Sequence, residues 1–544
     1  MKSAASLRIV MAQLNLLVGD VAGNTRRVIA CCHRARDKMD AQAIVFPELT
    51  LTAYPPEDLL LRPVLYTRVL AGLERIRKAV TGIHVIVGHP YQTKDGLFNA
   101  VTVLRDGEIL GRYSKQHLPN YSVFDEKRYF VPGKSATIVE IGGVSVGVTV
   151  CEDLWMPGPI QQAVDSGAQL IVNLNASPFH VGKGSEREDV ARARIKESGV
   201  PVLYVNLVGG QDQLVFDGGS FAMDGSGSLV QRAPSCIEDL VPVDILPGEP
   251  LQFQPGQLAE QPGELEAIYN VLVLGVKDYI EKNAFPGAVI GLSGGIDSAL
   301  TLAIAVDAIG RQRVAAVMMP SRYTADMSLE DARQQAKFLG VEYSELSIEP
   351  AVGAFRDILA DTFSGSPADI TEENIQARCR GVILMAISNK KHKILLTTGN
   401  KSELAVGYAT LYGDMAGGFA PLKDVPKTLV YRLAEYRNRF EAVIPQRVLE
   451  RPPSAELAPD QKDEDSLPPY NTLDAILERY VELDESIDEL IQAGFDGAVV
   501  QKVAAMVDRN EYKRRQAPPG VRITRRAFGR DRRYPITSGF NKGR

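Results

Sequence analysis

The segment that most constrains this chain is GLSGGIDS at residues 291–298, which follows the apolar run AVI and opens the helix-like run ALTLAIAV. Glycines at 294 and 295 let the backbone approach an anion closely, and the N-terminus of the following helix offers free N–H groups to a phosphate. The segment matches neither a Walker A loop, since it lacks the lysine, nor GxGxxG. It predicts a phosphate site at a strand-to-helix turn, against the simpler alternative of a glycine-rich turn without a ligand.

The length of 544 residues predicts two domains, because single cores stop growing at about 250–300 residues. Residues 246–266 contain several Pro and Gly and no sustained period, which is typical of a linker. We therefore predict domains at 1–245 and 267–544. Beyond the linker, strand-then-helix units repeat, as in a doubly wound parallel sheet.

Composition excludes several classes of protein. Hydrophobic residues make up 45% and charged residues 24%, as in an average globular protein, and the net charge of −6 argues against nucleic-acid binding. The arginine-rich tail from Arg514 to Arg533 is interpreted as solvated surface. Five cysteines without a CxxC pair indicate a reducing, cytoplasmic setting, and no apolar run is long enough to span a membrane.

The N-terminal half alternates short apolar strands with longer amphipathic stretches, which indicates an α/β fold. Two hairpins are predicted, one turning at Asp106-Gly107 and one at Gly142-Gly143. The sheets of this domain are therefore expected to be mixed.

Three residues of this half each end a strand-like run: Glu48 in VFPELT, Lys115 in GRYSKQHLP and Cys151 in VTVCEDLW. Release of ammonia from an amide requires a nucleophile, a proton-transferring base and a positive group for the oxyanion. Cysteine, glutamate and lysine can fill these roles. A neighbouring lysine would also lower the pKa of the thiol. The alternative, an incidental Lys115–Glu48 ion pair, leaves the strand-end placement unexplained.

The order and spacing of these residues resemble the nitrilase superfamily, over about residues 6–245. The resemblance implies an α-β-β-α sandwich with Cys151 as nucleophile, Glu48 as base and Lys115 as oxyanion stabiliser. It further implies that glutamine is the amide substrate, contacted by Tyr121, Glu126, Ser177 and Lys183.

The SGGIDS segment resembles the pyrophosphate loop of ATP pyrophosphatases, a group that includes asparagine, GMP and NAD synthetases. The ATP contacts that follow are Gly291, Leu292, Ser293, Gly294, Gly295, Ile296, Asp297, Ser298 and Thr398. Asp297 is predicted to bind Mg²⁺, because that ion on a triphosphate usually takes one or two carboxylates. The resemblance gives Glu403 as a second magnesium ligand, which also serves the dinucleotide.

Three further segments resemble the NAD synthetases: TEENIQARCRG (371–381), residues 394–428 and NEYKRR near the end. They imply that deamido-NAD is contacted by Asn374, Arg378, Glu403, Asp414 and Lys513. Taken singly, Asn374 and Arg378 are ordinary residues of a helix surface. Some relatives have His before the lysine, where this chain has Tyr512.

Together these features resemble the glutamine-dependent NAD synthetases over nearly the whole chain. The resemblance implies a ligase that hydrolyses L-glutamine and uses the ammonia, with ATP and Mg²⁺, to amidate deamido-NAD, forming AMP and pyrophosphate. It also implies a homo-oligomer. The alternatives are another amidotransferase with the same ATP loop and a non-catalytic regulatory homologue.

Overall fold

The structure is a computed structural model that describes residues 6–458 and 461–540. The chain divides after Gly263 into two compact units, each with its own core. Among the described residues, no helix is long and apolar enough to cross a membrane.

The first unit is built on two sheets. The seven-stranded sheet has the order β15 (Gln252–Phe253), β14 (Asp239–Leu246), β1 (Leu7–Gln13), β2 (Ala43–Val45), β3 (His84–Thr93), β4 (Gly96–Arg105) and β5 (Glu108–Ser114). The six-stranded sheet has the order β13 (Leu229–Arg232), β12 (Phe221–Met223), β9 (Val202–Asn206), β8 (Leu170–Asn175), β7 (Val144–Val150) and β6 (Ile138–Ile141). A separate hairpin joins β10 (Val208–Gln211) to β11 (Leu214–Asp217).

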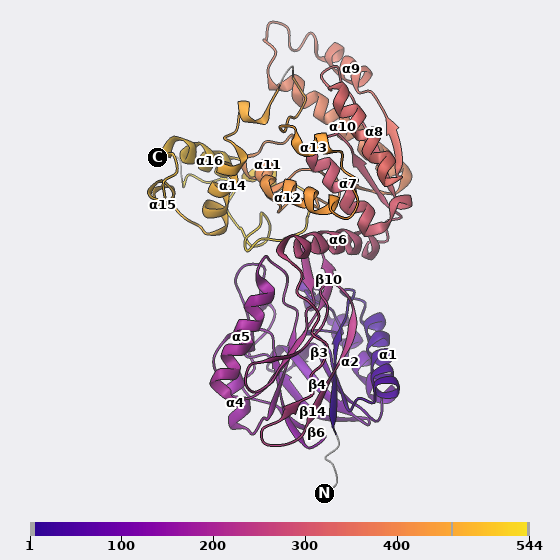
Figure 1. Cartoon of the computed structure of the whole chain (residues 1–544), viewed down its shortest axis with the longest axis vertical. Helices are drawn as coiled ribbons and strands as arrows, with labels where there is room; N and C mark the ends of the chain where they lie inside the picture. Colours follow the sequence, from indigo (N-terminus) through magenta and orange to yellow (C-terminus); the bar gives the residue numbers. More distant parts are fainter. Residues whose placement is uncertain (1–5, 459–460, 541–544) are drawn as a thin grey trace. The chain divides into compact units, whose positions relative to one another are not determined.

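Helices cover the outer face of each sheet. The inner faces share one buried apolar cluster, which includes Val45 of β2 and Val148 of β7. Helices α1 (Val21–Met39) and α2 (Pro63–Ala79) lie on one flank of the unit, and α4 (Pro159–Asp165) and α5 (Lys183–Ser198) lie on the other (Figure 1). This arrangement confirms the predicted α-β-β-α sandwich.

Both predicted hairpins form. Strand β4 pairs antiparallel with β5, and β6 with β7. Asp106 and Gly107 have φ values of 48° and 84°, and Gly142 and Gly143 have 59° and 81°. Two successive positive φ values are those of the tight turns that match strand twist. The mixed sheets are therefore confirmed.

Most of the segment predicted as a linker, 246–266, belongs to the first unit, which ends at Gly263. Strand β15 lies within it and pairs with β14, and the Gly256 N–H donates to the Val230 carbonyl. Helix α6 (Glu264–Lys282) then opens the second unit. The predicted domain boundaries stay a prediction.

The second unit contains a parallel sheet in the order β18 (Glu342–Glu345), β17 (Val314–Met318), β16 (Ala288–Gly291) and β19 (Ile394–Leu396). One face packs on α9 (Glu349–Leu359) and α10 (Ile370–Lys391), and α7 (Ile296–Ile309) and α8 (Asp326–Leu339) pack on the other. The doubly wound parallel sheet is therefore as predicted. In such sheets, ligands bind at the carboxyl ends of the strands.

Shorter helices complete this unit. They are α11 (Lys401–Val406), α12 (Lys427–Asn438), α13 (Gln446–Glu450), α14 (Tyr470–Leu477), the π-helical turn η5 (Glu478–Glu482), α15 (Ile487–Gln492), α16 (Gly497–Arg509) and α17 (Glu511–Arg514). Helices α14, α15 and α16 gather in one lobe (Figure 1) around an apolar cluster that contains Leu473 and Val503. Single 3₁₀ turns lie at η1 (Glu57–Leu61), η2 (Glu126–Arg128), η3 (Arg311–Arg313) and η4 (Asp463–Asp465).

The arginine-rich tail is not simply solvated surface, as its composition led us to expect. Arg514, Arg522 and Arg532 are buried, with exposed fractions of 5%, 5% and 3%. Each forms ion pairs with a buried carboxylate, which is what allows a guanidinium to leave water. The prediction was therefore wrong for these three residues.

Candidate active sites

Cys151 lies at a tight turn between a strand and a helix. Strand β7 ends at Val150, helix α3 (Glu152–Trp155) begins one residue after Cys151, and the Cys151 N–H donates to the Leu174 carbonyl at 2.9 Å. The backbone of Cys151 has φ 44° and ψ −100°, a conformation that residues other than glycine rarely adopt. Such strain is typical of a turn that presents a nucleophile.

Lys115 connects the two glutamates of this site. Its Nζ donates to Glu48 Oε1 at 2.7 Å and to Glu126 Oε1 at 2.8 Å, and all three side chains are buried. Glu48 also accepts hydrogen bonds from Asn99 Nδ2 at 2.7 Å and from the Ala176 N–H at 3.1 Å. The structure therefore brings together the predicted base, the predicted oxyanion stabiliser and Glu126.

Burial and the charges of the neighbouring side chains together set the protonation states of Lys115 and Glu126. Burial alone would lower the pKa of Lys115, but Glu126 and Glu48 outweigh it and raise that pKa well above its ordinary value. Burial raises the pKa of Glu126 to about 7, although Lys115 opposes the shift. The Lys115 side chain is therefore a permanent cation, held in place by its partners.

Lys115 lowers the pKa of the Cys151 thiol, as predicted, but its effect is too small to favour the thiolate. Burial raises this pKa well above its ordinary value, the Glu48 carboxylate raises it further, and Lys115 offsets only part of the increase. Desolvation disfavours the charged form of any thiol. Cys151 is therefore a neutral thiol at rest, and its proton must pass to a base when it reacts.

The remaining predicted glutamine contacts lie around Cys151. The Tyr121 hydroxyl donates to the Glu152 carboxylate at 3.1 Å, and the Lys183 ammonium lies 3.8 Å from the ring centre of Trp155. Ser177 Oγ accepts a hydrogen bond from Arg187 Nε at 3.1 Å. The site thus offers a carboxylate, an ammonium and hydroxyl groups, the chemistry needed to hold an amino acid.

Asp153 is a residue of this site that sequence reasoning missed. Its buried carboxylate accepts the N–H groups of Gln116 at 3.1 Å, His117 at 2.8 Å and Val150 at 3.2 Å. It thereby joins the segment that carries Lys115 to the turn that carries Cys151. Its place two residues after the cysteine was the only signal in the sequence.

The second site is a cavity of about 390 Å³ in the second unit. The predicted residues that line it are Gly291, Leu292, Ser293, Gly295, Ile296, Asp297, Ser298, Asn374, Thr398, Glu403, Asp414 and Lys513. Gly294 does not line the cavity but shapes the loop: its φ is 78°, and a Cβ there would lie 2.4 Å from the Ser328 carbonyl oxygen. Only glycine fits this position.

Asp297 and Glu403 share one cation in this structure, the ammonium of Lys427. Lys427 Nζ lies 2.5 Å from Asp297 Oδ2 and 3.0 Å from Glu403 Oε1. Burial raises the pKa of Glu403 to about 7, with Lys427 opposing the shift. Two partly buried carboxylates that already hold a positive charge suit a hard cation such as Mg²⁺.

These two carboxylates are not part of a larger set of ligands. Within residues 6–458 and 461–540, no three His, Cys, Asp or Glu side chains form a group that could hold a metal ion. Mg²⁺ usually takes one or two protein carboxylates and fills its other positions with phosphate oxygens and water. The pair therefore fits a magnesium ion that arrives with a nucleotide.

Three predicted dinucleotide contacts lie on neighbouring parts of the cavity wall. Thr410 connects two of them, since its hydroxyl donates to Asn374 Oδ1 at 2.9 Å and its N–H donates to Asp414 Oδ1 at 2.6 Å. Lys513 Nζ donates to the carbonyl groups of Gly407 at 2.8 Å and Ala409 at 2.9 Å.

Arg378 lies apart from the other predicted contacts. It is exposed, its Nε donates to the Leu411 carbonyl at 3.2 Å, and it does not line the cavity. Arg380, two residues along α10, lines the cavity instead. The stripe of α10 that faces the cavity also includes Asn374 and Ala377, and Arg378 falls outside it.

Sequence reasoning also missed two cationic residues of this site. Lys427 lies between the two carboxylates, and Arg451 donates to the Gly294 carbonyl at 2.7 Å and to Ser328 Oγ at 2.8 Å. Both are far from the glycine loop in sequence, and although Lys427 lies within the segment 394–428, nothing in the sequence singled it out. Arg451 directly follows α13, at the start of a proline-rich stretch whose composition does not indicate a binding site.

Comparison with known proteins finds a matching family for each unit of the chain. A family model described as "Carbon-nitrogen hydrolase" matches residues 8–248, and one described as "NAD synthase" matches residues 268–517. The chain is 48% identical to a glutamine-dependent NAD(+) synthetase of Xanthomonas campestris pv. campestris, over 99% of each chain. It is also 48% identical to that of Acinetobacter baylyi, over 98% of this chain and 99% of the relative.

Solved structures extend the likeness to three dimensions. The glutamine-dependent NAD+ synthetase from Acinetobacter baumannii, solved in complex with ADP, is 45% identical, with a TM-score of 0.81 over 99% of this chain and 100% of that one. That from Cytophaga hutchinsonii is 22% identical, with a TM-score of 0.86 over 99% of each, and shows a likeness of fold.

The raised pKa of Cys151 predicts how the thiol reacts in the resting protein. Its modification by methyl methanethiosulfonate, followed by mass spectrometry, should accelerate about tenfold per pH unit from about pH 7 to about pH 9, because the thiolate fraction keeps rising. Cys151→Ala identifies the modified site. A rate for Cys151 that levels off below about pH 8 would show a stabilised thiolate and contradict the assignment.

Proposed function

This chain belongs to the family of glutamine-dependent NAD(+) synthetases, and on that premise we propose which of its residues perform each half of the reaction. The observation that carries the proposal is the pair of lysine-centred sites, Lys115 between Glu48 and Glu126 and Lys427 between Asp297 and Glu403. One is suited to amide hydrolysis and the other to a nucleotide with its metal.

In the first unit, Cys151 Sγ attacks the carboxamide carbon of L-glutamine. Because the thiol is neutral at rest, Glu48 takes its proton during the attack and returns it to the departing nitrogen, which leaves as ammonia. Lys115 is held as a cation and stabilises the oxyanion. Water, deprotonated by Glu48, then cleaves the thioester to glutamate.

Recognition of glutamine is assigned to residues around Cys151. Tyr121, Ser177 and Lys183 contact the substrate, with the Lys183 ammonium placed to meet a carboxylate. Glu126 orients the carboxamide and holds Lys115 in place. These roles rest on the family resemblance together with the positions of the side chains.

In the second unit, ATP occupies the cavity with its phosphates on residues 291–298 and with Thr398 among its contacts. The nicotinate carboxylate of deamido-NAD attacks the α-phosphorus, which releases pyrophosphate and forms an adenylate. Ammonia then displaces AMP and leaves NAD. Asn374, Glu403, Asp414 and Lys513 hold the dinucleotide, and Arg378 is retained as a contact on the resemblance alone.

Asp297 and Glu403 would hold Mg²⁺, which when bound neutralises phosphate charge. Mg²⁺ on these carboxylates would take the place of the Lys427 ammonium, since both are cations, and Lys427 would then turn toward the phosphates. A homo-oligomer is proposed on the family resemblance, as are the domain boundaries at 245 and 267.

The two nitrogen sources should separate in Cys151→Ala. Alanine removes the nucleophile, so glutamine-dependent NAD synthesis should fall by about a thousandfold or more, while ammonium-dependent synthesis stays near wild type. Both rates are measured as NAD formed, with Cys236→Ala as the matched control in the same unit. Near-normal synthesis from glutamine, with free ammonia excluded, contradicts the assignment of Cys151.

Asp297→Asn should lower NAD synthesis about a hundredfold with either nitrogen source, because asparagine keeps the size of the side chain and removes the charge that holds magnesium. Raising the Mg²⁺ concentration should restore part of the activity. Asp357→Asn, at an exposed position of α9, is the control. If the variant keeps its ammonium-dependent rate and its magnesium requirement, Asp297 is not a metal ligand.

A further inference from the structure

From residue 518 on, the arginine-rich C-terminal tail lies beyond the part of the chain that matches the NAD synthase model, which ends at residue 517. The structure nevertheless packs parts of residues 518–534 against the segments next to the nucleotide cavity. Two buried ion clusters make this connection, one at Glu511 and one at Lys401. Each cluster includes a residue or backbone group of the tail.

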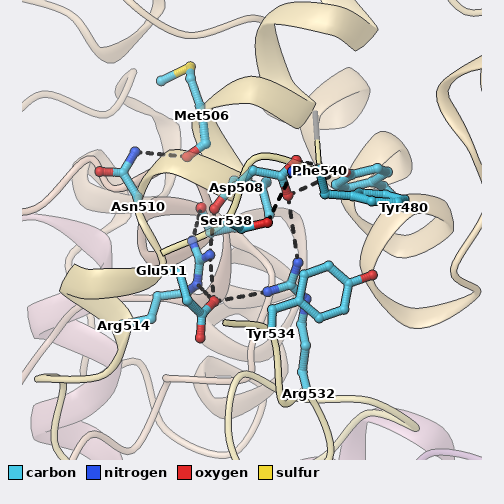
Figure 2. Close-up of polar contacts among 12 residues, drawn as sticks. Tyr480, Met506, Asp508, Asn510, Glu511, Arg514, Arg532, Tyr534, Ser538 and Phe540 are labelled. Atoms are coloured by element: carbon cyan, nitrogen blue, oxygen red, sulfur yellow. Dashed lines mark hydrogen bonds and ion pairs between the residues drawn. The ribbon is translucent and has the colours of Figure 1, made fainter. Parts of the chain in front are cut away.

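Glu511 is the centre of the first cluster. Its carboxylate, 5% exposed, accepts hydrogen bonds from Arg514 at 2.9 Å, Arg515 at 2.8 Å and Arg532 at 3.0 Å. Figure 2 shows Arg532 reaching Glu511 from the tail. The Arg532 guanidinium also stacks 3.7 Å from the ring centre of Tyr534, so its orientation is held from two sides.

This cluster holds the helix that carries Lys513. Glu511 is the first residue of α17, and Lys513 lies two residues later, with its Nζ on the carbonyl groups of Gly407 and Ala409 at the cavity wall. Asn510, just before α17, donates to the Val406 carbonyl at 2.8 Å (Figure 2 labels this residue). A helix of four residues has little stability of its own, so its position depends on these anchors.

The second cluster ties the tail to α11, which carries Glu403. Lys401 Nζ donates to Asp424 at 2.8 Å, to Glu482 at 2.7 Å and to Thr524 Oγ1 at 2.7 Å. Asp424 in turn accepts the Thr524 N–H at 2.7 Å. Thr524 is therefore fixed to the start of the helix that presents Glu403 to the cavity.

From these contacts we infer that the tail is a positioning element of the synthetase site, with Arg532 acting through Glu511 to hold Lys513 in place for the dinucleotide. The inference rests on the proposed contact between Lys513 and deamido-NAD. When Arg532 is removed, the Glu511 carboxylate stays paired with Arg514 and Arg515. The expected effect is therefore a shift in the position of α17. Binding of the dinucleotide should suffer more than binding of ATP.

The experiment compares Arg532→Ala with Arg533→Ala, the neighbouring exposed arginine, in the full-length protein with ammonium as nitrogen source. In Arg532→Ala the KM for deamido-NAD should rise about tenfold, while the KM for ATP stays close to wild type. Arg532→Lys keeps the charge and should recover most of the loss. Arg533→Ala should behave as wild type.

A double variant separates this inference from the contact on which it rests. Lys513→Ala alone should raise the KM for deamido-NAD, and adding Arg532→Ala should raise it no further, because both changes remove the same contact. If Lys513→Ala has no effect, the proposed contact itself is wrong, and the inference falls with it. If Lys513→Ala acts and Arg532→Ala does not, or if the two effects add, the tail does not position Lys513.

Should Arg532→Ala fail to fold, Arg532→Gln provides the same test with a longer side chain, and Glu511 stays paired with Arg514 and Arg515. It should raise the KM for deamido-NAD in the same way and have no further effect when combined with Lys513→Ala. An unchanged KM in a folded Arg532→Gln variant overturns the inference.

Discussion

Both sites of this chain depend on a buried lysine ammonium held between two carboxylates. Lys115 lies between Glu48 and Glu126, and Lys427 lies between Asp297 and Glu403. A buried charge is tolerated only where its partners are in place, and removing one partner leaves an uncompensated charge. Each lysine and its two carboxylates must therefore be held together by the surrounding backbone. The strands and helices around each site hold these three side chains in place.

In the proposed mechanism, the same arrangement performs different chemistry in the two units. Around Cys151 the cation is permanent, because Lys115 is fully enclosed and its pKa is raised, and it would stabilise a charge that develops during the reaction. At the nucleotide cavity the carboxylates line open space, so a magnesium ion that arrives with the phosphates would replace the lysine. The two roles differ because Lys115 is enclosed by protein, whereas Asp297 and Glu403 are accessible from the cavity; the residue types at the two sites are similar.

The sequence predicted the site residues that lie at the ends of strands or in a glycine-rich turn. Glu48, Lys115 and Cys151 each follow a strand, and residues 291–298 join β16 to α7. The parallel sheet followed from the pattern of strands and helices, whereas the sandwich was implied by the resemblance to the nitrilase superfamily. The sequence did not predict Lys427, which meets Asp297 only through folding, or Asp153, whose four partners are mostly backbone N–H groups. The net sign of the Cys151 pKa shift was wrong because burial, invisible in sequence, outweighs one neighbouring charge. The burial of Arg532 was missed for the same reason.

The central claim is that nitrogen released at Cys151 becomes the amide nitrogen of NAD in a reaction that forms an adenylate. It is tested most directly by supplying glutamine labelled with ¹⁵N in its amide, together with ATP and deamido-NAD and without added ammonium. Mass spectrometry should find ¹⁵N in the nicotinamide group of the NAD, with AMP formed in equal amount. Unlabelled NAD, or formation of ADP in place of AMP, would contradict the account.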